Sequence, residues 1–248
     1  KWYTTAARSA PGAHLVLSET ASTPAGGCPG LSNTYASGFW FVNQLGIVAG
    51  EGFWQLYRQN VIGDDYSLAG NKAWAGGPPD KVWANRTGPL VPNPDFFTAL
   101  LWQRLMGSTF LGSSLGDIKP DSPLPVRVHV ACAGVGKPGR DVTVAFLNGG
   151  TTALTARLDG MRPSSRVEYI LTPGDERGLL SRSVRLNDGD SLHISDQLPG
   201  RVVEGDVTHL EFPAQTYGFF VLKEVGAAAC AVRGRPLLRR NQAADKAV

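Results

Sequence analysis

The chain lacks the features that would place it in several large classes of protein. Its 248 residues contain no run of about 20 apolar residues that could span a membrane and no N-terminal signal pattern. They contain no RNA- or DNA-binding motif, and the net charge is only +3. Charged residues make up 18% of the chain, and glycine (30) and proline (17) are plentiful, which favours strands and loops over helical bundles. We therefore expect a globular protein without a nucleic-acid partner.

Cysteine and histidine are too few and too scattered to suggest a metal centre. The three cysteines form no Cys-x-x-Cys pair, and the four histidines stand far apart in the sequence. We expect neither a metal nor a cofactor. The chain also begins at Lys1 without an initiator methionine, so we expect a piece of a longer protein. Asn85-Arg86-Thr87 is a glycosylation sequon with Asn85 as its acceptor.

The first part of the chain alternates strands and helices. A strand-like run ends near Glu19, and apolar residues spaced three or four apart from Leu31 to Leu45 predict a helix that Gly46 is placed to end. A second strand is expected within 53–62. Asn93-Pro94-Asp95 then predicts the start of a second helix.

Gly107 is placed to end that second helix. Trp40, Trp54 and Trp102 fall in the apolar patterns of these helices and strands and are expected in the core.

The order of these elements gives two βα units, whereas eight are needed to close a (β/α)8 barrel. Residues 1–117 are therefore expected to be the last units of a truncated TIM-barrel domain.

Beyond Pro120 the apolar pattern changes to a period of two. Val126, Val128 and Val130 alternate with polar residues, as expected for a half-buried strand. Further strands are expected at 142–146, 152–158, 166–171, 183–186, 192–194, 209–212 and 218–222. Short strands with regular turns predict an antiparallel β-sandwich over 118–226. The rest, 227–248, is aperiodic and is expected to be a disordered tail. The fold class is α/β plus all-β.

Glu19 is the residue most informative about chemistry. It ends a strand that opens into a loop with Gly26 and Gly27, and barrel active sites are built where such strands end. A retaining glycosidase needs two carboxylates about 5–5.5 Å apart, one of them a nucleophile. Glu19 suits that nucleophile, although a lone glutamate at a strand end is more commonly a solvated surface acid.

Several motifs in a fixed order point to one family. They are Ser18-Glu19-Thr20 with Gly26-Gly27, Leu31-Ser32-Asn33-Thr34-Tyr35, Gln44-Leu45-Gly46, Arg58-Gln59, Ile62-Gly63-Asp64-Asp65-Tyr66, Pro92-Asn93-Pro94-Asp95, Leu100-Leu101-Trp102-Gln103-Arg104-Leu105-Met106-Gly107, Gly178-Leu179-Leu180-Ser181 and Pro213-Ala214-Gln215-Thr216-Tyr217-Gly218-Phe219-Phe220-Val221. Together they resemble heparanase and its plant relatives in glycoside hydrolase family 79. The resemblance extends over roughly residues 14 to 230.

The resemblance implies a retaining hydrolase that cleaves β-linked glucuronic acid, with a glucuronic-acid-containing glycan or glucuronide as its partner. Glu19 then corresponds to the nucleophile. Gly26 and Gly27 correspond to a loop that approaches the sugar carboxylate through backbone N–H groups, and Gln59 and Tyr66 to residues that line the site. The alternatives are ordinary turn glycines, a glutamine that satisfies buried backbone and a tyrosine that packs in the core.

The sequence departs from the family pattern at two places and shares a pair of cysteines with the animal members. Pro24 and Ala25 stand where the family often carries an aromatic residue and a glycine, and Asp65 replaces an asparagine beside a negatively charged substrate. Cys132 and Cys230 match a pair that is disulfide-bonded in the animal members, with two buried thiols as the alternative. A disulfide implies an oxidising compartment, so we expect a secreted, lysosomal, vacuolar or extracellular-matrix protein, with peripheral contact to a membrane or cell wall left open.

The family's acid/base glutamate follows an asparagine on an earlier barrel strand, and this chain contains no Asn-Glu dipeptide. We therefore expect the acid/base upstream of this chain and the chain alone to be inactive. Two other functions stay open: a non-catalytic remnant that binds acidic glycans, and an inactive fragment without function.

Overall fold

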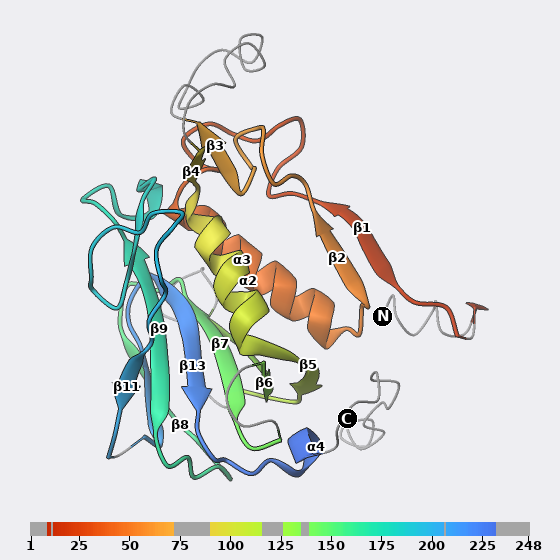
Figure 1. Cartoon of the computed structure of the whole chain (residues 1–248), viewed down its shortest axis with the longest axis vertical. Helices are drawn as coiled ribbons and strands as arrows, with labels where there is room; N and C mark the ends of the chain where they lie inside the picture. The colour runs from red at the N-terminus through yellow and green to blue at the C-terminus, as the bar shows by residue number, and fades with distance from the viewer. Residues whose placement is uncertain are drawn as a thin grey trace.

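The computed structural model describes residues 9–10, 12–71, 90–115, 126–134, 139–205 and 207–231. Three layers follow one another across the molecule (Figure 1). A large, mainly antiparallel sheet forms one side, two helices pack on it in the middle, and a pair of parallel strands lies on the far side. None of the described helices is long and apolar enough to cross a membrane. The expected glycosylation site, Asn85, lies outside the described residues.

The two predicted βα units are confirmed. Strand β1 (Val16–Thr20) leads to helix α2 (Tyr35–Gly50), and strand β2 (Gln55–Arg58) is followed, after the short antiparallel pair β3 (Ala69–Asn71) and β4 (Leu90–Pro92), by helix α3 (Pro94–Leu105). Strands β1 and β2 pair in parallel, as βα units require. Asn93 is the N-cap of α3 and Pro94 its first residue, as the sequence predicted.

Gly46 does not end helix α2, which continues to Gly50, so that prediction is wrong. The reason is packing: Gly46 is buried against His129, and a Cβ atom at position 46 would lie 2.1 Å from that imidazole ring. Gly38, two turns earlier, is placed in the same way, since its Cβ would lie 2.0 Å from the hydroxyl of Tyr217. The two glycines let α2 lie unusually close to the large sheet.

Helix α3 ends at Leu105, two residues before the predicted Gly107, and the chain enters strand β5 (Met106–Leu111) directly. Gly107 lies inside this strand, where its Cβ would meet the backbone oxygen of Cys132 at 2.4 Å. Strand β5 pairs with strand β6 (Val126–Ala133) and so belongs to the large sheet although it precedes residue 117. The expected boundary at 117–118 itself lies outside the described residues.

The large sheet has seven strands, and most of them were predicted. Besides β5 and β6 it contains β7 (Val142–Asn148), β9 (Arg166–Pro173), β10 (Val184–Leu186), β11 (Arg201–Val203) and β13 (Thr216–Leu222). Its path runs β10-β9-β13-β7-β6-β5, and β11 pairs with β9 off that path. Two further strands, β8 (Leu154–Arg157) and β12 (His209–Phe212), pair with each other in a separate sheet. Residues 192–194 were expected to form a strand, and they do not. After the turn at Asn187 and Asp188 the chain makes only one isolated bridge, between Arg185 and Ser191.

The sheet is buried on both faces. One face packs against α2 and α3 through a core that includes Tyr217, Phe219 and Val221, and the other packs against the β8–β12 pair through Phe220 and Leu222. The β8–β12 pair is therefore the second sheet of the expected sandwich, and the helices cover the opposite face of the large sheet. The seven residues of β7 and the seven of β13 are all buried.

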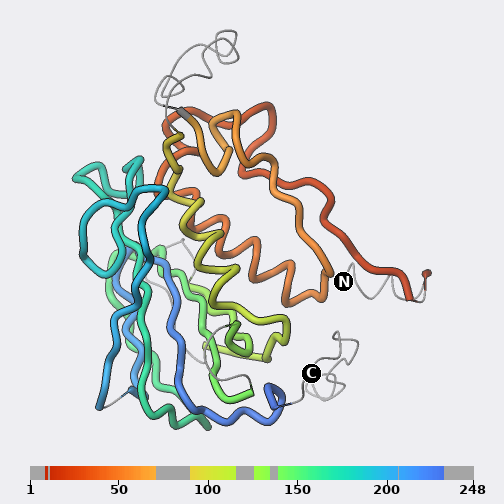
Figure 2. Tube along the Cα trace, in the orientation of Figure 1, coloured from red at the N-terminus to blue at the C-terminus, as the bar shows by residue number. Residues whose placement is uncertain are grey.

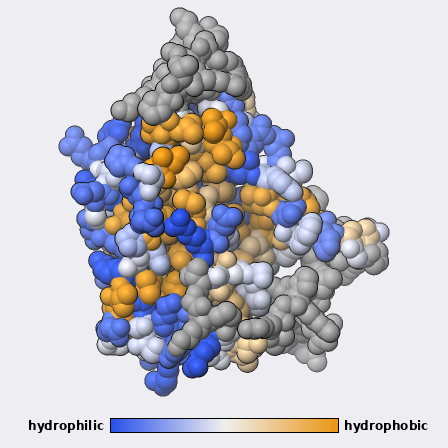
Figure 3. Space-filling view, viewed as in Figure 1, coloured by the Kyte–Doolittle hydropathy of each residue, from blue (hydrophilic) through white to orange (hydrophobic). Residues whose placement is uncertain are grey.

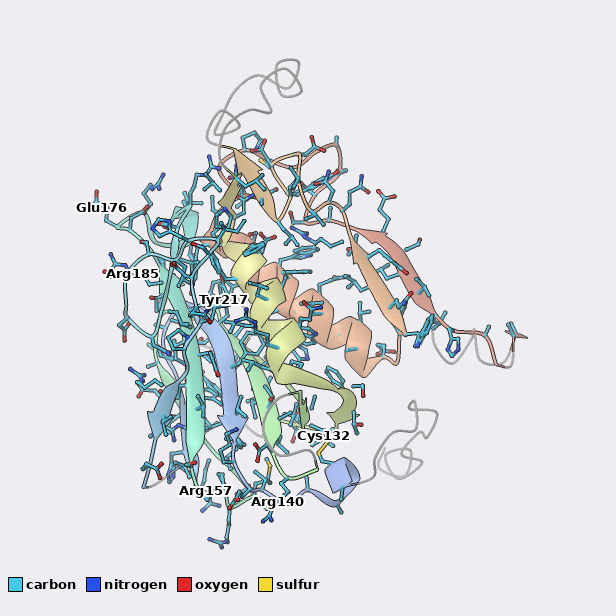
Figure 4. The ribbon with its side chains drawn as sticks, viewed as in Figure 1. Cys132, Arg140, Arg157, Glu176, Arg185 and Tyr217 are labelled. Atoms are coloured by element: carbon cyan, nitrogen blue, oxygen red, sulfur yellow. A yellow bond between two sulfur atoms is a disulfide. The ribbon has the colours of Figure 1, made fainter. Side chains whose placement is uncertain are left out.

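The expected disulfide is present between Cys132 of β6 and Cys230, at a sequence separation of 98. Cys230 belongs to a short helix, α4 (Ala228–Ala231), which lies beside the end of the sheet (Figure 4). The bridge thus joins the first strand of the expected sandwich to α4. Residues 227–231, expected in a disordered tail, are described here, whereas 232–248 lie outside the described residues.

Candidate active site

Glu19 is the penultimate residue of β1, and its side chain is exposed. The pairing of β1 with β2 shifts register between Leu17 and Thr20, so Glu19 lies in a bulged part of the strand. Bulges of this kind re-aim side chains near functional sites. The carboxylate is therefore free of the core, at the end of a parallel strand, as a nucleophile requires.

The loops that follow β1 and β2 meet at the same end of the molecule (Figure 2). Gly26 and Gly27 have positive φ values of 86° and 107°, a region that favours glycine. A Cβ on Gly27 would lie 2.8 Å from the backbone nitrogen of Tyr66, and the N–H of Tyr66 donates to the carbonyl of Gly26 at 3.4 Å. The structure thus brings together three residues that the sequence predicted for one site.

Gln59 joins the same group through the backbone. Its N–H donates to the carbonyl of Thr20 at 2.9 Å, directly after Glu19 in the chain. Gln59 is half-buried, while Tyr66 is only 6% exposed. The N–H of Gly27 donates to the Pro24 carbonyl at 3.3 Å, so a ligand carboxylate at this amide would compete with a long hydrogen bond.

Arg58, on β2, links the loop that carries Tyr66 to helix α3. Its guanidinium donates to the backbone oxygen of Tyr66 and pairs with Asp95 at the start of α3. It also lies 4.8 Å from the ring centroids of both Trp40 and Phe41. Arg58 therefore makes a buried structural ion pair.

Asp95 is completely buried. Burial raises the pKa of its carboxyl to about 7, and Arg58 opposes that rise. Burial likewise lowers the pKa of Arg58. The pair is a desolvated link between the loop that carries Tyr66 and helix α3.

Asp65 is a second acid beside the glycine loop. It is half-buried, and the side-chain amide of buried Asn33 donates to its Oδ1 at 2.6 Å. Burial raises the pKa of Asp65, while the hydrogen bond from Asn33 and the charge of Arg182 act to lower it. Asn33 was not singled out from the sequence as a site residue, because nothing local marks it as a contact of Asp65.

Several large side chains on and next to the β1–β2 pair are exposed. Val16, Tyr57 and Trp54 are 38%, 52% and 58% exposed, so Trp54 is not in the core as expected. Instead it stacks on His14, with 4.7 Å between ring centroids. Apolar atoms are visible at the surface on this side of the molecule (Figure 3). The described residues contain no group of three or more His, Cys, Asp and Glu side chains that could hold a metal ion.

No family model matches the chain. Among curated proteins, it is 31% identical over 230 residues to heparanase of Mus musculus, covering 89% of this chain and 39% of that protein. It is 35% identical over 170 residues to baicalin-beta-D-glucuronidase of Scutellaria baicalensis, covering 68% and 27%. It is 27% identical to inactive heparanase-2 of Homo sapiens, covering 90% and 37%. The chain thus spans about two-fifths or less of the length of these relatives.

Among solved structures, the chain is similar to a family 30 endoxylanase from Clostridium papyrosolvens, with a TM-score of 0.50 and 11% identity. The match covers 89% of this chain and 45% of that chain. An exported protein from Bacteroides fragilis gives the same TM-score and identity, covering 89% and 41%. At this identity the likeness concerns the fold alone.

Proposed function

Because the chain is homologous to the heparanase-like glycoside hydrolases of family 79 along nearly nine-tenths of its length, we propose that it carries the nucleophile half of a retaining β-glucuronidase site. The observation that carries this proposal is the position of Glu19. It is an exposed carboxylate at the end of a parallel strand, beside the loop of Gly26 and Gly27, in a chain related to glucuronidases.

In the proposed reaction a carboxylate oxygen of Glu19 attacks the anomeric carbon of a β-linked glucuronic acid. The bond from that carbon to the glycosidic oxygen breaks, and a second carboxylic acid gives its proton to the departing oxygen. Water then attacks the same carbon, loses a proton to the second carboxylate and releases Glu19. We propose that this acid/base comes from outside the 248 residues, so the chain alone does not complete the reaction.

The other predicted residues have roles in binding. We propose that the backbone N–H groups of Gly26 and Gly27 face the sugar carboxylate, and that Gln59 and Tyr66 line the glucuronide site. Arg58 positions Tyr66 through its backbone oxygen and does not touch the sugar. The substrate class, a glucuronic-acid-containing glycan or a glucuronide, follows from the relatives and belongs to the proposal. The disulfide supports an oxidising compartment.

The test is a Glu19→Gln variant of the longest natural form of the protein, assayed on an aryl β-glucuronide. Loss of the nucleophile is expected to reduce kcat by about 10³-fold or more. Glu51→Gln is the matched control, since Glu51 is exposed just after α2, at the opposite end of that helix from the site, and is expected to leave kcat unchanged. Retention of activity in Glu19→Gln would sink the proposal.

A second function is favoured by one finding, the 27% identity to a relative named inactive heparanase-2. In this case the protein binds an acidic glycan without cleaving it. It predicts glycan binding that is unchanged in Glu19→Gln, together with no release of glucuronic acid by either form.

A further inference from the structure

The loop of Gly26 and Gly27 packs closely on the loop that carries Asp64, Asp65 and Tyr66. A Cβ atom on Gly26 would lie 3.3 Å from Cγ of Asp64. A Cβ atom on Gly27 would lie 3.0 Å from Cβ of Asp65 and 2.8 Å from the backbone nitrogen of Tyr66. The hydrogen bond from the N–H of Tyr66 to the carbonyl of Gly26 is long, at 3.4 Å. A bond of this length holds the two loops only weakly, so their spacing depends on other contacts.

Asn33 supplies such a contact. Its amide nitrogen donates to Oδ1 of Asp65 at 2.6 Å, and its amide oxygen accepts the N–H of Gly30, in the glycine loop, at 3.0 Å. Both bonds belong to one planar amide, so this side chain spans the two loops. Asn33 is only 1% exposed, and a hydrogen bond to a carboxylate is stronger than one between neutral groups. Loss of the bond would leave a buried polar group unpaired.

Asn33 is itself held in place by the chain on both sides of it. Tyr35, two positions later, is the first residue of α2, and its N–H donates to the carbonyl of Ser181 at 2.7 Å. Ser181 lies just before β10, an edge strand of the large sheet. On the other side of Asn33, the hydroxyl of Ser32 accepts the N–H of Cys28 at 2.9 Å. The amide of Asn33 is therefore anchored to helix and sheet, as a group that orients a binding loop must be.

We propose that Asn33 is a positioning residue, which sets the spacing between the loop of Gly26 and Gly27 and the loop of Tyr66 so that the glycine N–H groups face the sugar carboxylate. This inference deepens the proposed function and rests on it. Asn33 does not touch the sugar, because it is buried. The inference also gives Asp65 a task in this chain, since its carboxylate accepts the hydrogen bond that joins the two loops.

The test exchanges the two hydrogen-bonding side chains, one at a time and then together, in the longest natural form of the protein. Asn33→Asp replaces the donor with a second carboxylate at the same place, and the two acids repel each other. Hydrogen exchange at the amides of Gly27 and Tyr66 is expected to quicken by roughly 10- to 100-fold. KM for an aryl β-glucuronide is expected to rise about tenfold, while kcat falls by no more than about threefold. A merely structural role would reduce the fraction of folded enzyme, and hence kcat, and leave KM as it was.

The double variant Asn33→Asp/Asp65→Asn restores the hydrogen bond in the opposite sense, because the amide at position 65 now donates to the carboxylate at position 33. That carboxylate can still accept the N–H of Gly30. The pair keeps one negative charge, so Asp64 and Arg182, the other charged groups that act on position 65, face the same total charge. Exchange and KM should return to within about threefold of the starting protein.

Gln44→Glu is the matched control, since it makes the same change from amide to acid at a half-buried residue within α2, and it should alter neither quantity. An Asn33→Asp variant with normal exchange or a normal KM overturns the inference, and so does a double variant that stays altered. If exchange responds as expected but even the unaltered protein cleaves no glucuronide, the proposed function fails, and the role of Asn33 in sugar binding fails with it.

Discussion

The large sheet and the β1–β2 pair differ in how far their strands are buried and paired within their own sheet. Strands β7 and β13 are buried at every position and on both faces. Strands β1 and β2 pair only with each other among the described strands, and their register is interrupted beside Glu19. The part that carries the proposed chemistry therefore depends on the helices and the sheet behind it, as active sites commonly depend on a rigid scaffold.

The largest expected effect comes from the sheet core. Phe220→Ala removes a ring that stacks on Phe146, 5.0 Å between centroids, and is expected to lower the free energy of unfolding by about 4 kcal/mol. The counterpart on the other region is Tyr57→Ala, on β2, whose side chain is half exposed and should change stability by no more than about 0.5 kcal/mol. Urea denaturation measures both. A large cost for Tyr57→Ala would show that the β1–β2 face is covered in solution, and the comparison would break.

The link between the two regions comes next. Asp95→Ala leaves Arg58 buried without its partner, which is expected to cost about 3 kcal/mol. Hydrogen exchange should also quicken at the amide of Tyr66, because Arg58 holds the loop of that residue. Asp175→Ala, which removes an exposed ion pair with Arg177, should change little. Unchanged exchange at Tyr66 in Asp95→Ala would show that the loop is held without this pair.

A smaller effect is expected where helix meets sheet. Gly46→Ala places a methyl group against the ring of His129 and is expected to cost about 2 kcal/mol. Gly50→Ala is the control, because no described atom lies within 4 Å of its Cβ position, and alanine is the better helix former. If the two variants melt alike, α2 and the sheet adjust their spacing more easily than their close packing indicates.

The smallest expected change in stability is that of Glu19→Gln. Its side chain is exposed, so unfolding free energy should stay within about 0.5 kcal/mol of the starting value. This variant sharpens the comparison, because a residue with a very large effect on catalysis would have almost none on folding. A pronounced change in urea midpoint would mean that Glu19 is held by structural contacts.

Local patterns predicted the elements that depend on local chemistry. Asn93-Pro94-Asp95 marked the start of α3, and the alternation around Val128 and Val144 marked two central strands. Two of the errors arose where a distant residue decides the outcome. Gly46 was taken as a helix end because its neighbour in space, His129, lies far along the chain, and β5 was missed because its partner strand comes later.

The candidate site divides in the same way. The order of motifs predicted that Glu19, Gly26, Gly27, Gln59 and Tyr66 belong together, and the structure brings their segments into contact. The Arg58–Asp95 pair and the contact between Asn33 and Asp65 had no local signal, because each joins residues more than 30 positions apart.

Gly38 and Gly46 have a consequence for how this protein can evolve. A side chain at either position acts as a wedge that tilts α2 away from the sheet, and the N-terminus of α2 carries Asn33 and the Ser181 contact. Substitutions at these two positions should therefore be selected against through their effect on the loops around Gly26 and Asp65, although the glycines themselves face Tyr217 and His129. The conformation of those loops thus depends partly on how closely α2 packs on the large sheet.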